Sequence, residues 1–328
     1  MSEHKHSEEK DSQYEALQSS NFKQQKLSAW RPVPTITSTT ITFITFGLLF
    51  ITIGIIITLF SNQIQEISVD YSNCETKEEE IINNKNNNKY KIKRCSIKLD
   101  IKNKMVQPVM VYYQLDNFYQ NHRRYVKSKS NEQLAGNVLS VDDLLFDCDP
   151  IVKNSDLIPG TLSLSGKNIT KESPDEAAYP CGLIAKSFFN DRYRFKNDDI
   201  KINESNIAWA SDKELKYKLP DRKDYKDIMW IDTTDEHFMV WMRPAGLPNF
   251  RKLWGRIEKD IEPGSYEVEI DYNYDIDFGG KKHFVLSTVN AFGGKNSFLG
   301  ISYIVVGGVC LVLALLFFIG YKSHSKTA

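Results

Sequence analysis

Two long apolar runs stand out from the pattern of apolar and polar positions along the chain. From Ile41 to Phe60 the sequence reads ITFITFGLLFITIGIIITLF, without a charged residue, proline, asparagine or glutamine. A second run, FLGISYIVVGGVCLVLALLFFIGY, extends from Phe298 to Tyr321. At about 1.5 Å per helical residue, about 20 residues cover the roughly 30 Å hydrocarbon core, where a helix satisfies its own backbone polar groups. Both runs therefore predict transmembrane helices.

Charged residues beside the first run predict the orientation of the chain. Residues 16–35 include lysine and arginine but no acid, whereas Glu66 and Asp70 follow the run. By the positive-inside rule the N-terminus is cytosolic, and two spans return the C-terminus to the same side. We therefore expect a cytosolic tail of residues 1–35, a first helix of residues 36–60, a lumenal or extracellular ectodomain of residues 61–297, a second helix of residues 298–321 and a cytosolic tail of residues 322–328.

Between the two runs, several segments alternate apolar and polar side chains with the period of two expected of a half-buried strand. The alternation is regular from Cys95 to Lys102 and from Tyr266 to Tyr274. The runs VMVYYQL, from Val109, and HFVLSTVNAF, from His283, also have the composition of strands. These four segments predict the main strands of the ectodomain.

Three further segments complete the predicted secondary structure. HFMVWM, from His237, is almost uniformly apolar and predicts a buried strand, and NFRKLWGRI, from Asn249, suits a short helix. ETKEEEIINNKNNNKYKIK, between Cys74 and Cys95, is a polar, Asn-rich insert that we interpret as a flexible surface loop. Short strands and turn residues dominate, so the ectodomain should be mainly β or α+β, with antiparallel sheets.

Composition narrows the class of protein. The hydrophobic content of 41% and the mean hydropathy of −0.40 average two membrane helices with a polar ectodomain. The chain has 42 basic and 42 acidic residues, so no basic excess points to nucleic acid as a partner. The first apolar run begins too late and is too long for a cleavable signal peptide, so we interpret it as a signal anchor.

Four of the five cysteines, Cys74, Cys95, Cys148 and Cys181, fall in the predicted ectodomain, and Cys310 lies in the second apolar run. An even number in the ectodomain fits an oxidising lumen. Several connectivities are possible, and we favour Cys74 with Cys95 and Cys148 with Cys181, because neighbours in sequence close the shortest loops. The chain has neither a C-x-x-C pair nor histidines at zinc-finger spacing, so we expect no metal site.

Two sequons also lie in the predicted ectodomain, NIT at Asn168 and NES at Asn203. Sequons occur by chance in any chain, but the predicted orientation places both of these in the lumen, where N-glycosylation takes place. We therefore expect glycans on Asn168 and Asn203.

The sequence contains no recognisable catalytic motif. The patterns H-E-x-x-H, G-x-S-x-G, G-x-G-x-x-G and the P-loop are all missing. His122, His237 and His283 each stand alone, and such histidines are mostly hydrogen-bonded structural groups. We expect neither enzymatic activity nor a cofactor. A lumenal hydrolase stays open as an alternative, since a catalytic carboxylate pair is defined by its spacing in space.

Small residues recur every seven positions in both apolar runs. They are Gly300, Gly307 and Ala314 in the second run, and Thr40, Gly47, Gly54 and Ser61 in and beside the first. Because seven residues make two helical turns, each set forms one narrow stripe where helices could pack closely, either on one another or on another subunit. The alternative is that glycine is simply common in membrane helices. Trp30, before the first run, is either an interfacial anchor or a partner contact.

Four longer runs carry a resemblance to a known family. They are VYYQLDNFYQNHRRYVKS from Val111, PCGLIAKSFFND from Pro180, DEHFMVWMRPAGLPNFRKLWGRI from Asp235 and GGKNSFLG from Gly293. The chain resembles the accessory, or beta, subunits of type-IV P-type ATPases, the lipid flippases, which form the cell-division-control/ligand-effect-modulator family. This resemblance implies a two-span glycoprotein with a disulfide-bonded, antiparallel β-sandwich-like lumenal domain.

The resemblance also implies a non-catalytic role beside a catalytic subunit. In such a heterodimer the accessory chain is needed for folding, exit from the endoplasmic reticulum and activity of an ATPase that moves aminophospholipids or other phospholipids to the cytosolic leaflet. This chain lacks the D-K-T-G-T motif of an aspartyl-phosphate ATPase, so phosphorylation belongs to the other subunit. We expect an integral membrane protein of the endoplasmic reticulum, Golgi or endosomes and plasma membrane, in contact with membrane lipids.

Two local features bear on the expected partner. Where the family usually reads MRTAALP, this chain has MRPAGLP from Met242, in a loop that could meet the other subunit. Arg123 and Arg124 are candidates for the partner interface, although they could equally be solvated or paired surface residues, since exposed ion pairs contribute only about 0–1 kcal/mol. The alternative, from another functional class, is that the chain is an adhesion or receptor-like glycoprotein that binds extracellular ligands. That alternative predicts that no ATPase copurifies with it.

Overall fold

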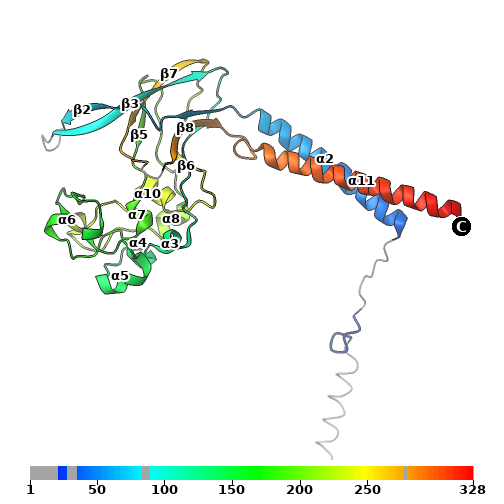
Figure 1. Cartoon of the computed structure of the whole chain (residues 1–328), viewed down its shortest axis with the longest axis horizontal. Helices are drawn as coiled ribbons and strands as arrows, with labels where there is room; N and C mark the ends of the chain where they lie inside the picture. The colour runs from blue at the N-terminus through cyan, green and yellow to red at the C-terminus, as the bar shows by residue number, and fades with distance from the viewer. Residues whose placement is uncertain (1–20, 28–34, 83–88, 277–278, 328) are drawn as a thin grey trace, which may run out of the picture. The chain divides into compact units, whose positions relative to one another are not determined.

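The computed structural model describes residues 21–27, 35–82, 89–276 and 279–327, and it divides into two units (Figure 1). The membrane unit contains the two long terminal helices up to Ile56 and from Phe298, and the ectodomain is Ile57–Ser297. Every strand that the structure describes belongs to the ectodomain. Trp30 lies outside the described residues, so its role stays a prediction.

The two long helices are α2 (Ile36–Asn62) and α11 (Ser297–Thr327). The spans Ile36–Asn62 and Ser297–Lys322 are long and apolar enough to cross a membrane, with mean hydropathies of 2.6 and 2.7. Threonine hydroxyls in α2 donate to carbonyl oxygens one turn earlier, as Thr45 does to Ile41 at 2.9 Å. Such side chains need no further partner in lipid, so the threonines do not interrupt the apolar span.

The ectodomain is built on two four-stranded antiparallel sheets that face each other. The first has the order β1 (Glu66–Asp70), β8 (Lys281–Thr288), β4 (Val109–Asp116) and β6 (Phe250–Ile257); the second has the order β2 (Lys77–Ile82), β3 (Lys89–Ile101), β7 (Gly264–Asp271) and β5 (Arg192–Phe195). The ring of Tyr193 in β5 lies 5.2 Å from Trp254 in β6 and 5.0 Å from Phe284 in β8. Aromatic side chains of both sheets therefore share one core, which confirms the expected sandwich-like fold.

A period of two in burial shows which side chains face this core. In β4, Val109, Val111, Tyr113 and Leu115 are buried and alternate with partly exposed residues. β4 pairs with β8 on one side and with β6 on the other, so it lies in the middle of its sheet. The strands predicted at Cys95, Val109, Tyr266 and His283 are all present.

Between β4 and β6 the chain leaves the sandwich and forms short helices beside one end of it (Figure 1). We call residues 117–191 and 196–249 the helical lobe. Its helices are α3 (Arg123–Lys127), α4 (Asn131–Leu134), α5 (Val141–Cys148), η1 (Asn154–Asp156), α6 (Ile169–Glu172), α7 (Leu183–Lys186), α8 (Ala210–Leu215), α9 (Tyr225–Ile228) and α10 (Glu236–Trp241). The helices are short because Pro and Gly punctuate this part of the sequence.

Two disulfides join the cysteines of the ectodomain. Cys74 pairs with Cys95, with Cα atoms 6.0 Å apart, and Cys148 pairs with Cys181, with Cα atoms 5.7 Å apart. The second bridge is buried in a small apolar cluster of the helical lobe with Leu144 and other side chains. It links the end of α5 to the residues just before α7, so it closes the loop-rich middle of the lobe.

Two predicted elements are wrong: a predicted strand is a helix, and a predicted helix is a strand. The segment at His237 is helix α10, not a strand: the Asp235 carboxylate accepts a hydrogen bond from the His237 N–H at 2.9 Å and caps it. The segment after Asn249 is strand β6, not a helix, because it pairs with β4 from Phe250 to Ile257. A short apolar run has no clear period, so pairing with a neighbouring strand decides the outcome.

The Asn-rich insert is also not the loop that its composition predicts. Strands β2 and β3 pair across it as an antiparallel hairpin, from Lys77 opposite Arg94 to Ile82 opposite Lys89. Isoleucine and tyrosine in this stretch favour strands, and they outweigh the polar composition. Residues 83–88, at the tip, lie outside the described residues.

Candidate functional site

Three of the four sequence runs that carry the family resemblance meet at one buried tryptophan. Trp241, at the end of α10, is fully buried, and its indole N–H donates to the carbonyl oxygen of Ile184 in α7 at 2.7 Å. Its ring centroid lies 6.5 Å from that of Tyr113 in β4 and 5.7 Å from that of Phe118. The runs from Val111, Pro180 and Asp235 are therefore packed around one ring.

Hydrogen bonds between side chains reinforce this junction. The hydroxyl groups of Tyr125 and Ser187 lie 2.7 Å apart, and burial raises the pKa of Tyr125 to about 12. The backbone N–H of Ala245, in the loop after α10, donates to the side-chain oxygen of Gln120 at 2.9 Å. The junction thus connects the segments around α3 and α7 with the MRPAGLP loop.

Lys252 holds the other side of the same loop. From β6 its buried Nζ donates to the carbonyl oxygens of Val240 and Trp241, at 3.0 and 2.8 Å, and also to that of Arg243. A cation at the end of a helix satisfies carbonyl groups that have no partner within the helix. Burial, with a smaller effect of the Arg243 charge, lowers the pKa of Lys252 to about 7.

A buried ion pair ties the PCGLIAKSFFND run to β8. The Nζ of Lys282 donates to Oδ2 of Asp191 at 2.8 Å, and both side chains are fully buried. The other carboxylate oxygen accepts the backbone N–H groups of Asn273 and Tyr274, each at 2.7 Å. Both oxygens of the carboxylate therefore have hydrogen-bond partners within the protein, which is typical of a structural group.

Two of the three histidines named from the sequence, His237 and His283, are likewise paired with other side chains. His237 stacks on Trp254 with ring centroids 3.9 Å apart, and its Nε2 lies 3.0 Å from a Glu204 carboxylate oxygen. The Nε2 of His283 lies 2.9 Å from Asp116. Within the residues that the structure describes, no group of three or more His, Cys, Asp or Glu side chains is placed to hold a metal ion.

Arg123 and Arg124 begin helix α3 on the surface of the helical lobe. Arg124 lies 3.5 Å from Asp149, but the two side chains are 75% and 63% exposed, so this contact contributes at most about 0–1 kcal/mol. Arg124 also borders an apolar depression of about 470 Å3 that is lined by Tyr119, Tyr125 and Leu183 among others. Both arginines are free to serve a partner, and their assignment to an interface stays a proposal.

The two sequons have the same local geometry. In each, the asparagine Oδ1 accepts the hydroxyl of the third sequon residue: Thr170 at 2.9 Å for Asn168, and Ser205 at 2.6 Å for Asn203. Asn168 also caps helix α6, and Asn203 donates from Nδ2 to Glu258 at 3.1 Å. Both asparagines are partly exposed on the ectodomain.

The small-residue stripes lie where the two membrane helices meet. In α2 and α11 the buried residues are Gly47, Gly54 and Ser61, and Gly300, Gly307 and Ala314, among the side chains that the structure describes. A Cβ added to Gly307 would lie 2.8 Å from the carbonyl oxygen of Gly47, and one added to Gly54 would lie 2.8 Å from that of Gly300. The helices therefore run antiparallel with their backbones in close contact at glycine, and this stripe faces the chain's own partner helix.

We predict that Gly307→Leu separates the two helices, whereas Gly308→Leu does not. A Cβ on Gly307 would meet Ile51 and Gly47, whereas one on Gly308 would meet nothing within 4 Å. The measurement is disulfide crosslinking between the two helices. The cysteines replace Phe43 and Phe317, whose rings are stacked 5.8 Å apart, and Cys310→Ala removes the free cysteine of α11. Crosslinking should be lost with Gly307→Leu and kept with Gly308→Leu. Equal crosslinking in both variants would show that the stripe does not hold the helices together.

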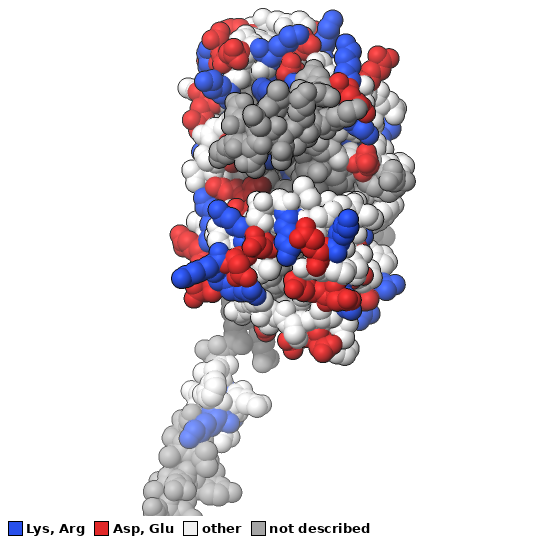
Figure 2. All heavy atoms as spheres, turned by 90° about the vertical axis from the view of Figure 1, so that its left-hand side faces the viewer, with Lys and Arg blue, Asp and Glu red and all other residues white. Residues whose placement is uncertain are grey.

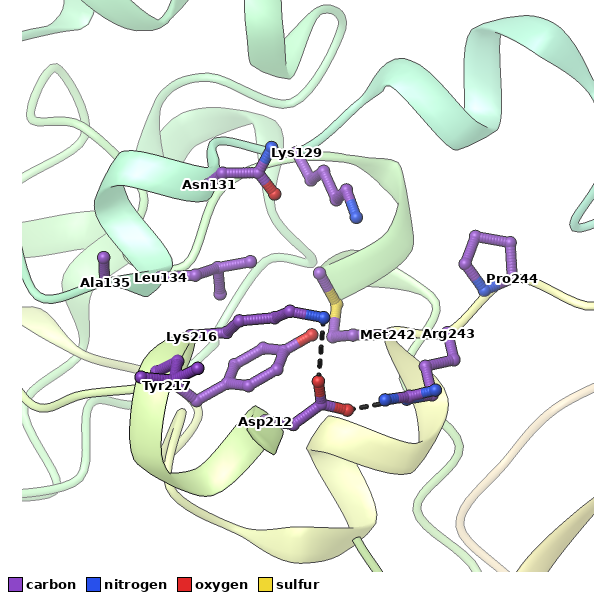
Figure 3. Close-up of a pocket in the computed structure, with 11 residues that line it drawn as sticks. Lys129, Asn131, Leu134, Ala135, Asp212, Lys216, Tyr217, Met242, Arg243 and Pro244 are labelled. Carbon is purple, nitrogen blue, oxygen red and sulfur yellow. Dashed lines mark hydrogen bonds and ion pairs between the residues drawn. The ribbon is translucent and has the colours of Figure 1, made fainter. Parts of the chain in front are cut away.

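A cavity of about 490 Å3 opens in the helical lobe, and the first residues of the MRPAGLP loop form part of its wall (Figure 3). Asp212 of α8 lies in its wall and is held by Arg243 at 2.6 Å and by Lys216 at 3.0 Å. Lys129 enters from another wall. Its lining comes from three separate stretches of the chain, residues 129–135, 212–217 and 242–244, and only the last of these belongs to a run that the resemblance singled out.

Comparison with known proteins places the chain in a family. It matches the family described as the LEM3 (ligand-effect modulator 3) or CDC50 family over residues 57–327. Cell cycle control protein 50A of Mus musculus is 36% identical over 349 residues, which cover 94% of this chain and 90% of that protein. ALA-interacting subunit 3 of Arabidopsis thaliana is 39% identical over 323 residues, which cover 92% of this chain and 85% of that protein. Since the family match covers most of the chain, and both relatives are more than 30% identical over more than nine tenths of it, the chain belongs to the LEM3/CDC50 family.

Proposed function

We propose that this protein is the non-catalytic accessory subunit of a type-IV P-type ATPase, a flippase that moves aminophospholipids or other phospholipids to the cytosolic leaflet. The observation that carries the proposal is the family match over residues 57–327, together with relatives that are named as interacting subunits. The chain has no D-K-T-G-T motif, so the phosphorylated aspartate and ATP hydrolysis belong to the partner.

In this function the accessory chain acts by binding the catalytic subunit through its membrane helices and its ectodomain. α2 and α11 provide a preassembled helix pair whose outer faces are apolar, and the ectodomain provides a folded, disulfide-bonded body. Assembly with such a pre-organised body costs less conformational entropy than assembly with a mobile chain would. The proposed need of the catalytic subunit for this chain in folding, exit from the endoplasmic reticulum and turnover follows from that support.

The proposed topology places both termini in the cytosol and the ectodomain in the lumen or outside the cell. Lysine and arginine before the first span support it, as do two disulfides and two surface sequons in the ectodomain. We propose that Asn168 and Asn203 are glycosylated, and that the protein occurs in the endoplasmic reticulum, Golgi or endosomes and plasma membrane.

Purification of the chain in mild detergent tests the proposed function. A large P-type ATPase should copurify at near-equal stoichiometry, and lipid-stimulated ATP hydrolysis should depend on an intact phosphorylation-site aspartate in that partner. The control is a chimera in which the two spans are exchanged for unrelated transmembrane helices. Repeated recovery of a lone, stable chain would instead favour the adhesion or receptor-like function.

A further inference from the structure

The cavity in the helical lobe has an excess of positive charge. Three cations, Lys129, Lys216 and Arg243, line it together with one acid, Asp212. Burial raises the pKa of Asp212, but the hydrogen bonds from Arg243 and Lys216 outweigh it, so the pKa lies below its ordinary value and Asp212 is ionised. One carboxylate against three cations leaves two positive charges uncompensated in the wall.

This charge is local and is not part of a basic surface. On the face of the ectodomain that Figure 2 shows, basic and acidic side chains are interspersed. The whole chain likewise has equal numbers of basic and acidic residues. A general attraction for anionic polymers or membranes therefore does not explain the three cations around one hollow.

Lys129 is the cation without a partner. Lys216 and Arg243 bind Asp212, but no hydrogen bond or ion pair joins the Nζ of Lys129 to another residue that the structure describes (Figure 3). Its ammonium extends into the cavity, and partial burial and the charge of Lys216 lower its pKa. A half-buried ammonium beside a second cation is unfavourable until an anion joins it.

The edge of the cavity is apolar and exposed. Leu215, which lines it, is 70% exposed. Trp209, one turn before Lys213 on the same segment, is 65% exposed, and its ring carries the Arg243 guanidinium at 3.6 Å. Tryptophan and arginine are the residue types that dominate the binding energy of protein interfaces, and here an exposed tryptophan and a partly exposed arginine lie together beside the cavity.

We propose that this cavity receives an acidic side chain, Asp or Glu, from a lumenal loop of the catalytic ATPase subunit, an inference that rests on the proposed function. The carboxylate binds the Lys129 ammonium and the N–H groups of Arg243 that Asp212 does not use, while Trp209 and Leu215 exclude water around it. Asp212 is a positioning residue, because it holds Arg243 and Lys216 in place. The apolar edge favours a protein loop over a hydrated inorganic anion or a lipid headgroup.

The first test compares Lys129→Glu with Lys127→Glu, two residues away on exposed α3 and outside the cavity. Each variant is coexpressed with the ATPase that copurifies with the wild-type chain. Lys129→Glu should lower the recovered ATPase at least about tenfold, and Lys129→Arg should restore it, because a carboxylate facing Asp212 is repelled. Lys127→Glu should recover wild-type amounts. Unchanged melting temperatures of the purified chains separate this effect from misfolding.

The second test identifies what enters the cavity. A photo-crosslinking amino acid at Leu215 should capture a lumenal peptide of the ATPase that contains Asp or Glu, and exchanging that acid for Lys should restore binding to Lys129→Glu. If the Lys129→Glu chain recovers as much ATPase as the wild-type chain, or if the crosslink reaches no ATPase peptide, the proposal is overturned. The proposed function still stands in that case, as long as the wild-type chain recovers the ATPase. If the Lys129→Glu chain recovers wild-type amounts of ATPase but changes the lipid stimulation of its ATP hydrolysis, the cavity is a lipid-headgroup site, and the proposal is also overturned. Failure of the wild-type chain to recover any ATPase refutes the function itself.

Discussion

A Gly182→Ala variant should lose about 2–5 kcal/mol of ectodomain stability, a large part of the total for a domain. Gly182 has a φ of +98°, where a residue with a Cβ costs about 1–2 kcal/mol. The added Cβ would lie 2.1 Å from the carbonyl oxygen of Ser128 and 2.6 Å from its carbonyl carbon. Relieving that overlap moves backbone, and overpacking of this kind costs roughly 1–3 kcal/mol more.

The neighbours of Gly182 have little room to move. Its own N–H donates to the carbonyl oxygen of Ile151 at 2.8 Å, and the next N–H, of Leu183, donates to the Ser128 hydroxyl at 2.8 Å. That hydroxyl donates in turn to the carbonyl oxygen of Cys148 at 3.0 Å. Three chain segments and the Cys148–Cys181 disulfide therefore cross at this glycine, so a shift in one of them breaks contacts in the others.

Gly166→Ala is the matched control. Gly166 has a φ of +92°, but a Cβ there would meet nothing within 4 Å, so it carries the conformational cost without the overlap. With about 2–4 °C per kcal/mol for a domain of this size, Gly182→Ala should melt roughly 4–20 °C below wild type and Gly166→Ala roughly 2–8 °C below it. Thermal unfolding of both purified chains decides the matter. Equal losses in the two variants would mean that the close approach to Ser128 is not tight.

The helices and strands that the sequence predicts well are those with a clear period. The two apolar runs are long enough to be membrane helices, and β3, from Cys95, and β7, from Tyr266, alternate apolar and polar residues, so their inward faces can be identified directly. α10 is mistaken for a strand because HFMVWM is apolar after His237 and shows no helical period. β6 is mistaken for a helix because its apolar residues Phe250, Leu253, Trp254 and Ile257 have helical spacing. Asp235, at the N-cap of α10, is the available signal for a helix.

The cavity could not have been predicted. Lys129, Asp212 and Arg243 are brought together by loops of the helical lobe, and no local pattern links charges so far apart in sequence. Trp209 offers only a weak hint, because an isolated tryptophan in a polar segment is as easily a core residue. By contrast, the seven-residue spacing of glycines is visible in the sequence, since helical geometry turns a fixed spacing into one face.

Two buried lysines illustrate a signal that is present in the sequence but easily overlooked. In β8 the inward positions include Lys282 with Phe284 and Leu286, and in β6 they include Lys252 with Trp254. A lysine on the apolar face of an alternating strand is buried with its ammonium, and it must then find acceptors. Lys252 finds carbonyl oxygens at the end of α10, and Lys282 finds the Asp191 carboxylate.

Lys282→Met should therefore cost about 3–5 kcal/mol of ectodomain stability, because it leaves a buried carboxylate without its counter-charge. Besides Asp191, the ammonium donates to the carbonyl oxygen of Tyr274 at 2.6 Å and lies 3.3 Å from the centroid of the Tyr272 ring. Lys281→Met is the control. Lys281 is 64% exposed and 3.7 Å from Asp70, a surface contact worth about 0–1 kcal/mol. Similar melting temperatures for the two variants would contradict the assigned role of the buried pair.

The pH dependence of the Lys282→Met defect provides an independent check. Burial raises the pKa of Asp191, and the Lys282 ammonium lowers it, so removing Lys282 raises that pKa further above the value in the unfolded chain. Between the unfolded and folded pKa values the native variant binds more protons than the unfolded chain, so its stability rises as the pH falls. The deficit relative to wild type should thus be largest at neutral pH and shrink in mild acid.

Adding Asp191→Asn to Lys282→Met should recover part of the loss at neutral pH, because the amide carries no charge. The amide oxygen must still accept the Asn273 and Tyr274 N–H groups, so the recovery is partial. A deficit that is independent of pH, and losses that add in the double variant, would mean that Lys282 acts through packing alone.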